Sequence, residues 1–432
     1  MLHIGIDDTD SVKGGCTTWL ATEIIRELSE FDLIGPPRLV RLNPNIQWKT
    51  RGNGAVALAL GRGVGSKRQI GSVGNNPVFS FERGKEVKYD KEQIMARVLD
   101  LVHKHSMPDS EPGLVISDSF LPEGLYWQGV SSIVTKKMLS ESIEGTLSTG
   151  LRGSRGIFGA ACSLAWSGSF SKINGISYTW ELIGYRKKEN WGLKRKIELS
   201  TVQKVSGIKT VFSCTDSDGK IAMVPHSPCP VLWGFRGTDD KNLIRNFELL
   251  GPEKPSRWLL YKTNQATDDH LRYKEINDIK DGDSVNLEVS VTTKINIIKG
   301  GHRFFEVKDR SNHTVKCAAF EPTKNFRQII DKLEIGDSLI ICGSVSNGTI
   351  NLEKLRILAL VPRFSKPANP ICDCGQRTHS SGKESYYRCK SCSNKYERPK
   401  MVEVSSGLEL KWYEPPASSR RHLSTPISLM KY

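Results

Sequence analysis

The chain has 432 residues, and 62 Lys and Arg against 47 Asp and Glu give it a formal net charge of +15. One hydrophobic core does not support this length, so we expect about three or four domains. The charge is spread along the chain and favours nucleic acid as a partner, with a generally basic soluble protein as the alternative. No apolar run reaches the length of a membrane span and no signal peptide precedes the first strand, which predicts a cytoplasmic protein without a membrane partner.

A strand predicted at residues 1–6 leads directly into a loop of carboxylates and glycines, followed by a predicted helix at residues 17–29. Carboxylate oxygens are the ligands that Mg²⁺ prefers, while glycines and a helix N-terminus turn backbone N–H groups toward phosphates. An acidic turn before a Ser/Thr helix cap is the alternative. The combination favours a metal and nucleotide site made of Asp7, Asp8 and Asp10, then Gly14 and Gly15, then Cys16, Thr17 and Thr18.

The next elements complete an α/β unit, which we assign to residues 1–130. Strands are predicted at 37–42 and 55–60, a mobile glycine-rich loop at 61–76, a helix at 90–103 and a strand at 113–117. Residues 131–275 alternate helices and strands and favour a two-layer α+β domain that may interleave with the first. Its predicted elements are a helix at 131–139, a Gly/Arg-rich loop at 150–156, and strands at 177–185, 210–212 and 259–261.

In residues 276–362 the sequence pattern changes and predicts short strands. Val285, Leu287, Val289 and Val291 alternate with polar residues, and a hairpin turn is predicted at residues 347–348. Five strands with one helix, at residues 323–333, between the third and the fourth are the order of an OB-fold. Another small barrel is the alternative.

Four clustered cysteines predict a structural zinc site in residues 363–400, before a tail at 401–432. Fourteen residues separate the two pairs, and four thiolates on two turns match the closed tetrahedral shell of Zn²⁺. The first pair is C-x-C rather than C-x-x-C, so His379 is an alternative to one sulfur. Basic and aromatic neighbours either stack on nucleic acid or form the small core. The expected ligands are Cys372, Cys374, Cys389 and Cys392.

Several unusual sequence motifs occur in one order along the chain. They are residues 5–11 (GIDDTDS), 16–18 (CTT), 38–54 (RLVRLNPNIQWKTRGNG), 178–186 (YTWELIGYR), 225–237 (PHSPCPVLWGFRG), 263–270 (TNQATDDH) and 421–423 (RHL). With these strings the chain resembles the archaeal 2-agmatinylcytidine synthetases. Two departures are Gln47, where proline is expected, and the shortened first cysteine pair.

The resemblance implies a multidomain α+β protein with a kinase-like ATP-binding domain, a ferredoxin-like domain, an OB-fold and a zinc ribbon, in that order. It also implies an ATP-dependent ligase that joins agmatine to C2 of the wobble cytidine in the isoleucine tRNA with a CAU anticodon. The cytosine O2 is phosphorylated, the agmatine amine attacks C2 and phosphate leaves, while ATP ends as AMP. ATP, Mg²⁺ and structural Zn²⁺ are the implied cofactors, and no obligatory protein partner is evident.

The resemblance also implies roles for the residues of the acidic loop. Thr18 becomes phosphorylated, with Thr17 as the adjacent candidate. Asp7, Asp8 and Asp10 hold Mg²⁺ across the phosphates, and any of them is a candidate base for a threonine hydroxyl.

Four further residues are candidates on weaker grounds. Lys49 and Arg51 are either phosphate clamps or part of a solvated loop. Agmatine is a dication that needs a carboxylate, and Glu181 is the candidate, with a structural ion pair as the alternative. His226 is expected to be a structural hydrogen-bonding residue rather than a general base.

Two rival functions belong to other classes. A non-catalytic single-strand nucleic-acid binder would need only the OB-fold, the ribbon and the basic surface, but three clustered carboxylates repel a polyanion unless a metal or nucleotide intervenes. An ATP-dependent RNA enzyme that uses another amine, such as lysine, differs only in its amine pocket.

Overall fold

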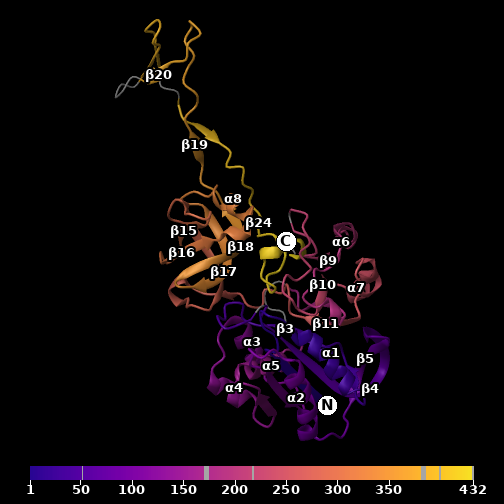
Figure 1. The fold of residues 1–432 in the computed structure, drawn as a ribbon. Helices are drawn as coiled ribbons and strands as arrows, with labels where there is room; N and C mark the ends of the chain where they lie inside the picture. Colours follow the sequence, from indigo (N-terminus) through magenta and orange to yellow (C-terminus); the bar gives the residue numbers. More distant parts are fainter. Residues whose placement is uncertain (51, 170–174, 217, 381–385, 398–399, 431–432) are drawn as a thin grey trace.

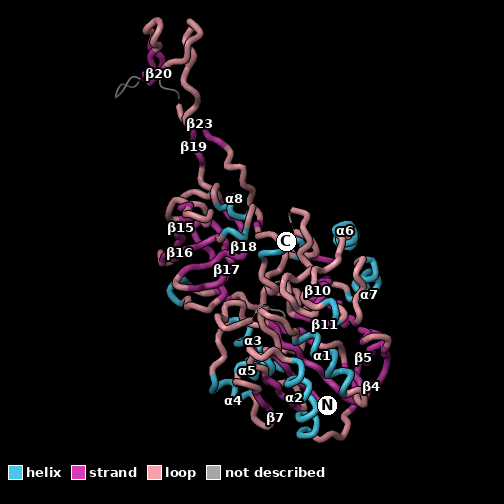
Figure 2. The backbone as a smooth tube through the Cα atoms, in the orientation of Figure 1, coloured by secondary structure: helices cyan, strands magenta, loops and turns pink. Residues whose placement is uncertain are grey.

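The computed structural model describes residues 1–50, 52–169, 175–216, 218–380, 386–397 and 400–430. These residues form a broad mixed sheet flanked by helices, a small β-barrel, and a terminal ribbon held away from both by a two-stranded stalk (Figures 1 and 2). The mixed α+β class is therefore confirmed. Among the described residues, we find no helix with the length and apolar character needed to span a bilayer.

In the described part of residues 1–275, eleven strands form one sheet. β3 (Arg38–Arg41) pairs in parallel with β11 (Arg257–Thr263), so strands from both sides of the predicted boundary at 130/131 belong to one sheet. The other strands are β1 (Leu2–Asp7), β2 (Asp32–Ile34), β4 (Gly54–Val73), β5 (Asn76–Lys85), β6 (Gly113–Ser117), β7 (Leu147–Gly150), β8 (Thr179–Tyr185), β9 (Val211–Phe212) and β10 (Val231–Gly237).

Helices cover both faces of this sheet because its strands alternate their apolar side chains. Leu2, Ile4 and Ile6 of β1 share one core with α1 (Thr17–Glu27) and α2 (Lys91–His105). The opposite face packs on α3 (Glu123–Ser131), α4 (Lys136–Ser142) and α5 (Arg155–Ala165). Two short helices, α6 (Leu199–Ser206) and α7 (Asp240–Asn246), complete this part of the chain.

α5 crosses β1 at very short range. A Cβ on Gly5 would lie 2.3 Å from the carbonyl oxygen of Ala160, and a Cβ on Gly159 would lie 1.7 Å from Oδ2 of Asp7. A side chain at position 5 would require the helix backbone to move, and one at position 159 would require the Asp7 side chain to move. This contact encloses the carboxyl end of β1, where the acidic loop begins.

The prediction of a mobile loop at residues 61–76 is wrong. β4 and β5 continue through this region as a long twisted hairpin, interrupted by irregular register. A Cβ on Gly63 would lie 2.2 Å from the Phe81 ring, so the glycine permits a close cross-strand contact rather than a flexible segment.

Two helix predictions need correction. Residues 131–139 are not one helix: α3 ends at Ser131, and α4 starts after Thr135, whose hydroxyl accepts a hydrogen bond from the Met138 N–H at 3.2 Å. The helix expected at 323–333 is shortened to α8 (Phe326–Ile330), and its later start follows from the positive φ of 46° at Lys324.

Five strands close the small barrel, as the alternation predicted, with α8 between the third and the fourth. β13 pairs with both β17 and β15, and β16 pairs with β18, which closes the ring. The strands of this sheet are β12 (Arg272–Tyr273), β13 (Ser284–Val291), β14 (Asn296–Ile297), β15 (Arg303–Lys308), β16 (Thr314–Ala319), β17 (Ser338–Ser346), β18 (Thr349–Ala359) and β24 (Trp412–Tyr413).

A buried ion pair joins the barrel to the rest of the molecule. Lys354 of β18 donates to Asp268 at 2.5 Å, and the same aspartate accepts from the backbone N–H of Thr425 at 2.7 Å. Beside it, His270 and Glu353 lie 2.9 Å apart. Barrel, central sheet and C-terminal tail therefore meet at one desolvated polar cluster.

We expect Lys354→Met to lower the free energy of unfolding by about 3–5 kcal/mol, because it leaves the Asp268 carboxylate buried without its cation. Urea unfolding followed by tryptophan fluorescence measures the change. Arg310→Met is the control, since the Arg310–Glu288 pair lies on the barrel surface and its loss should change little. Equal effects of the two variants would contradict the role assigned to the buried pair.

Candidate active site

One cavity of about 690 Å³ lies where the end of β1, the β3–β4 connection, strands β8 and β10 and the C-terminal tail converge. All the strings that carry the family resemblance contribute lining residues, although they are spread over more than 400 positions. Of the predicted site residues, those that line it are Asp7, Asp8, Asp10, Cys16, Thr17, Thr18, Lys49, Glu181 and His226.

The acidic end of the cavity carries the three aspartates. Asp8, with a positive φ of 53°, accepts a hydrogen bond from the backbone N–H of Glu111 at 3.3 Å. The Thr50 hydroxyl donates to Asp10 at 3.5 Å. Burial, followed by the charges of Asp8 and Asp10, raises the pKa of Asp7 to about 8. Three carboxylates in this setting favour an added cation.

The aspartates do not form a closed metal cage. Within the described part of the chain, only the four cysteines bring three or more potential metal-ligating atoms within 4.8 Å of one another. Mg²⁺ is commonly held by one or two carboxylates together with substrate phosphates and water.

Both threonines at the start of α1 are buried and line the cavity. The Thr9 hydroxyl donates to the Thr17 hydroxyl at 3.0 Å, and the Cys16 sulfur lies 3.0 Å from the Thr18 hydroxyl. The Tyr261 hydroxyl donates to the Thr18 carbonyl oxygen at 2.6 Å, which fixes the first turn of the helix.

Gly14 and Gly15, predicted to contact phosphates, are not among the residues that line the cavity. Gly14 pairs with Ser11 through two backbone hydrogen bonds of 2.9 and 3.2 Å. Gly15 has a φ of 73°, and a Cβ there would lie 2.8 Å from Cγ of Met107. The glycines therefore shape a tight turn under the acidic loop.

A basic wall borders another part of the cavity. Glu181 lies between two arginines: Nε of Arg236 is 3.0 Å from one carboxylate oxygen, and Nη2 of Arg41 is 3.6 Å from the other. Gln265 also donates to this carboxylate. Burial alone would raise the pKa of Glu181, but the charges of Arg236 and Arg41 outweigh it and lower the pKa.

Further basic groups extend this wall. Lys49 donates to the Ile46 carbonyl oxygen at 3.3 Å, and burial together with the Arg421 charge lowers its pKa. Burial and the charges of Arg41 and Arg236 hold the pKa of His422 well below its usual range, so its imidazole is neutral at pH 7. Arg51 lies outside the described residues.

Sequence reasoning missed several lining residues, although most stand in the quoted strings. The sequence marked these residues only by their position within a quoted string, because their spacing matches no recognisable motif. The missed residues are Arg41, Trp48, Arg236, Arg420 and His422.

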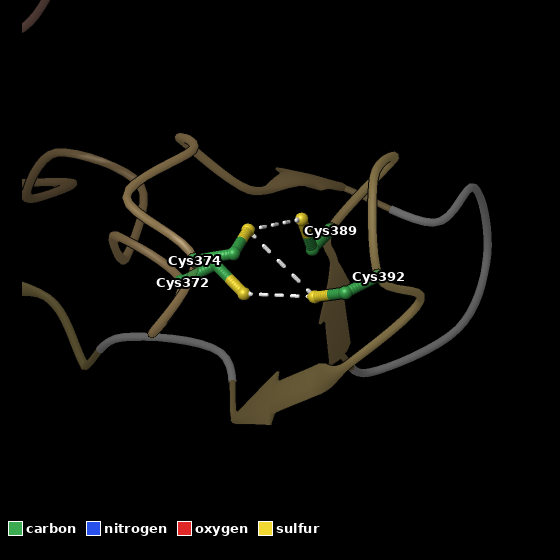
Figure 3. Close-up of side chains that lie close together, drawn as sticks. All are labelled: Cys372, Cys374, Cys389 and Cys392. Carbon is green, nitrogen blue, oxygen red and sulfur yellow. Dashed lines mark hydrogen bonds between the residues drawn. The ribbon is translucent and has the colours of Figure 1, made fainter.

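A second site lies in the terminal ribbon, where the four cysteine side chains point toward one another (Figure 3). The Sγ distances are 3.2 Å for Cys372–Cys392, 3.5 Å for Cys374–Cys389 and 3.8 Å for Cys374–Cys392. A tetrahedral Zn–S shell requires about 3.8 Å between sulfurs. The set fits Zn²⁺, and His379 is not part of this group.

We expect Asp7→Asn to raise the Tm of the metal-free protein by about 5 °C at pH 8. Between the ordinary pKa of 3.8 and about 8, the folded carboxyl holds its proton while the unfolded one is ionised. Wild-type stability therefore falls as pH rises through this window, whereas the amide does not titrate. The difference in Tm should grow from pH 4 to pH 8 and then level off.

Thermal denaturation in buffers with a chelator measures this profile. Asp100→Asn, on the exposed side of α2, is the control and should show no such trend. A Tm difference independent of pH would contradict the raised pKa of Asp7.

Three family models match the chain. They describe the TiaS TCKD domain over residues 3–149, the TiaS FLD domain over residues 154–270 and the TiaS C-terminal zinc ribbon domain over residues 369–406. The third match covers all four cysteines of the ribbon.

Relatives and solved structures agree along the whole chain. A protein of Methanocaldococcus jannaschii, named as the 2-agmatinylcytidine synthetase TiaS of an isoleucine tRNA, is 36% identical, with 100% of this chain and 99% of the relative covered. The protein of the same name from Methanosarcina mazei is 36% identical, with 98% and 96% covered.

Two crystal structures of complexes share the fold over 100% of this chain and 98% of theirs. The complex of TiaS with its isoleucine tRNA and ATP has a TM-score of 0.81 at 32% identity. The complex of TiaS with the same tRNA, AMPCPP and agmatine has a TM-score of 0.79 at 29% identity. With full-length relatives above 30% identity and three matching domain models, the chain belongs to the TiaS family.

Proposed function

We propose that this chain is a 2-agmatinylcytidine synthetase of isoleucine tRNA, an ATP-dependent ligase that joins agmatine to C2 of the wobble cytidine in the CAU anticodon. The observation that carries the proposal is one cavity in which an acidic end, two buried threonines and a basic wall face the same space. The full-length relatives bear this activity in their names.

The acidic end would hold Mg²⁺ through Asp7, Asp8 and Asp10, or a subset of them, together with phosphate oxygens of ATP. A bound magnesium ion neutralises charge on the phosphates. The raised pKa of Asp7 supports this assignment, because a nearby cation relieves the cost of a buried carboxylate.

The basic wall would bind phosphates from the other side. Arg236 and Arg41 are held in place by Glu181, and arginine offers a planar fork of donors suited to phosphate oxygens. Lys49 adds a partly desolvated positive charge. Arg51 stays a prediction as the second clamp.

Thr18 would be the phosphorylated threonine, with Thr17 as the adjacent candidate. Each of the three aspartates stays a candidate for the base that takes the threonine proton. In the ligation, the cytosine O2 is phosphorylated, the primary amine of agmatine forms the bond to C2, and the C2–O2 bond breaks as phosphate leaves.

The agmatine pocket is the least defined part of the proposal. Glu181 lines the cavity, but both of its carboxylate oxygens face cationic or amide donors of the chain itself. Its charge is thus largely balanced before a dication enters. We therefore keep Glu181 as a candidate whose first task is to orient Arg41 and Arg236.

We assign the kinase-like domain to residues 1–130, the ferredoxin-like domain to 131–275, the OB-fold to 276–362 and the zinc ribbon to 363–400, with a tail at 401–432. The barrel and the ribbon would bind the tRNA in the cytoplasm. A wobble base must leave its stack before C2 is reachable, and unstacking costs a few kcal/mol that such remote contacts offset.

The activity is tested with a CAU-anticodon transcript, ATP and labelled agmatine or lysine. We expect label from agmatine alone to enter the tRNA, with release of AMP. Label from lysine alone would favour the other amine, and tRNA binding without ATP cleavage or label would favour the non-catalytic binder.

We expect Asp8→Ala to reduce ATP cleavage by at least about 100-fold, because the variant loses a proposed Mg²⁺ ligand. Binding of the tRNA should persist, because Asp8 follows β1 of the central sheet and belongs to neither the barrel nor the ribbon. AMP formation and filter binding of the tRNA measure the two properties. Asp100→Ala, exposed on α2, is the control. Undiminished ATP cleavage in Asp8→Ala would place the nucleotide site elsewhere.

A further inference from the structure

The two cysteine turns of the ribbon repeat one backbone pattern, but the first is one residue shorter. In the second turn, the Cys389 N–H donates to the Asn394 carbonyl oxygen at 3.0 Å, and the Ser393 N–H donates to the Cys389 carbonyl oxygen at 3.1 Å. In the first turn, the Cys372 N–H donates to the Gln376 carbonyl oxygen at 2.8 Å, and the Gly375 N–H donates to the Cys372 carbonyl oxygen at 2.7 Å.

The missing residue removes one backbone donor from the site. Cys389 Sγ faces two backbone N–H groups, from Ser391 at 3.4 Å and from Cys392. The backbone N–H that faces Cys372 Sγ is that of Cys374. Both Cys372 and Cys389 are buried, so water cannot readily supply the second donor.

A side chain from β22 (Lys395–Glu397) supplies a second donor to Cys372 Sγ. The Tyr396 hydroxyl donates to Cys372 Sγ at 3.1 Å and accepts from the Asp373 N–H at 3.0 Å. It therefore contacts both the sulfur and the backbone of the shortened turn. β22 pairs with β21 (Tyr386–Arg388), which fixes the position of the ring.

We propose that the Tyr396 hydroxyl replaces the backbone donor lost from the C-x-C turn and is a positioning residue of the zinc site. Four thiolates around Zn²⁺ carry excess negative charge, and donors to sulfur stabilise that charge and orient the ligands. The hydroxyl also holds the Asp373 N–H, which limits the number of shapes that the short turn adopts.

The test uses the full chain loaded with zinc. Tyr396→Phe keeps the ring and removes the hydroxyl, so we expect zinc to pass to the chromophoric chelator 4-(2-pyridylazo)resorcinol about 10- to 100-fold faster than in the wild type. Tyr386→Phe is the control, because the Tyr386 ring instead lies 4.4 Å from the Lys395 ammonium. Its release rate should equal that of the wild type.

Cobalt substitution separates a contact with sulfur from a packing effect. Loss of a donor to a thiolate raises the energy of its electrons, so the sulfur-to-cobalt charge-transfer band of Tyr396→Phe should move to longer wavelength. A band and a release rate both equal to those of the wild type would overturn the proposal.

A rescue variant provides the sharpest check. Insertion of one glycine between Asp373 and Cys374 recreates a C-x-x-C turn with its second backbone donor. In that background, Tyr396→Phe should no longer accelerate zinc release. An undiminished effect would assign Tyr396 to packing alone and overturn the proposal; if the insertion prevents zinc binding, the cobalt band decides.

Discussion

The close contact of α5 with β1 is the constraint on which the candidate active site depends. Glycine at positions 5 and 159 lets the helix backbone approach the strand, and the approach encloses the Asp7 carboxyl. Enclosure raises the pKa of that group to about 8, because the ionised form loses water while Asp8 and Asp10 repel it. A structural requirement of the sheet thus produces a strong local preference for cations.

The basic wall lines the same cavity as this acidic end and carries the opposite charge. Arg41 on β3 and Arg236 on β10 are separated in the sheet by β11 and β8, and Glu181 on β8 contacts both arginines. A cavity with charge separated in this way suits a ligand that carries both a metal and phosphates. The neutral His422 also lines this cavity and adds a hydrogen-bonding group without further charge.

The remaining domains differ in how firmly they are attached. The barrel is joined by Lys354, Asp268 and Thr425 in a buried cluster that also fixes the tail along the cavity. The ribbon instead projects on the stalk of β19 (Arg363–Ser365) and β23 (Val402–Val404), well away from the sheet (Figure 1). Its shape depends on local contacts such as the cysteine cluster, since β20 (His379–Ser380), β21 and β22 are short. A firmly held barrel and a projecting ribbon suit a large substrate that must contact several places at once.

The sequence by itself determined the elements whose signals are local: the acidic loop after a buried strand, the clustered cysteines, the alternating barrel strands, and α2, whose buried Ile94, Val98 and Val102 recur every four residues. Only the tertiary structure decided which distant strings share a cavity, which cations balance Glu181, and which side chain completes the short cysteine turn. The hairpin at residues 61–76 was missed because its glycines look flexible until the ring that packs against Gly63 is known. Periodicity and spacing describe neighbours along the chain, whereas charge balance and close packing depend on residues that meet only after folding.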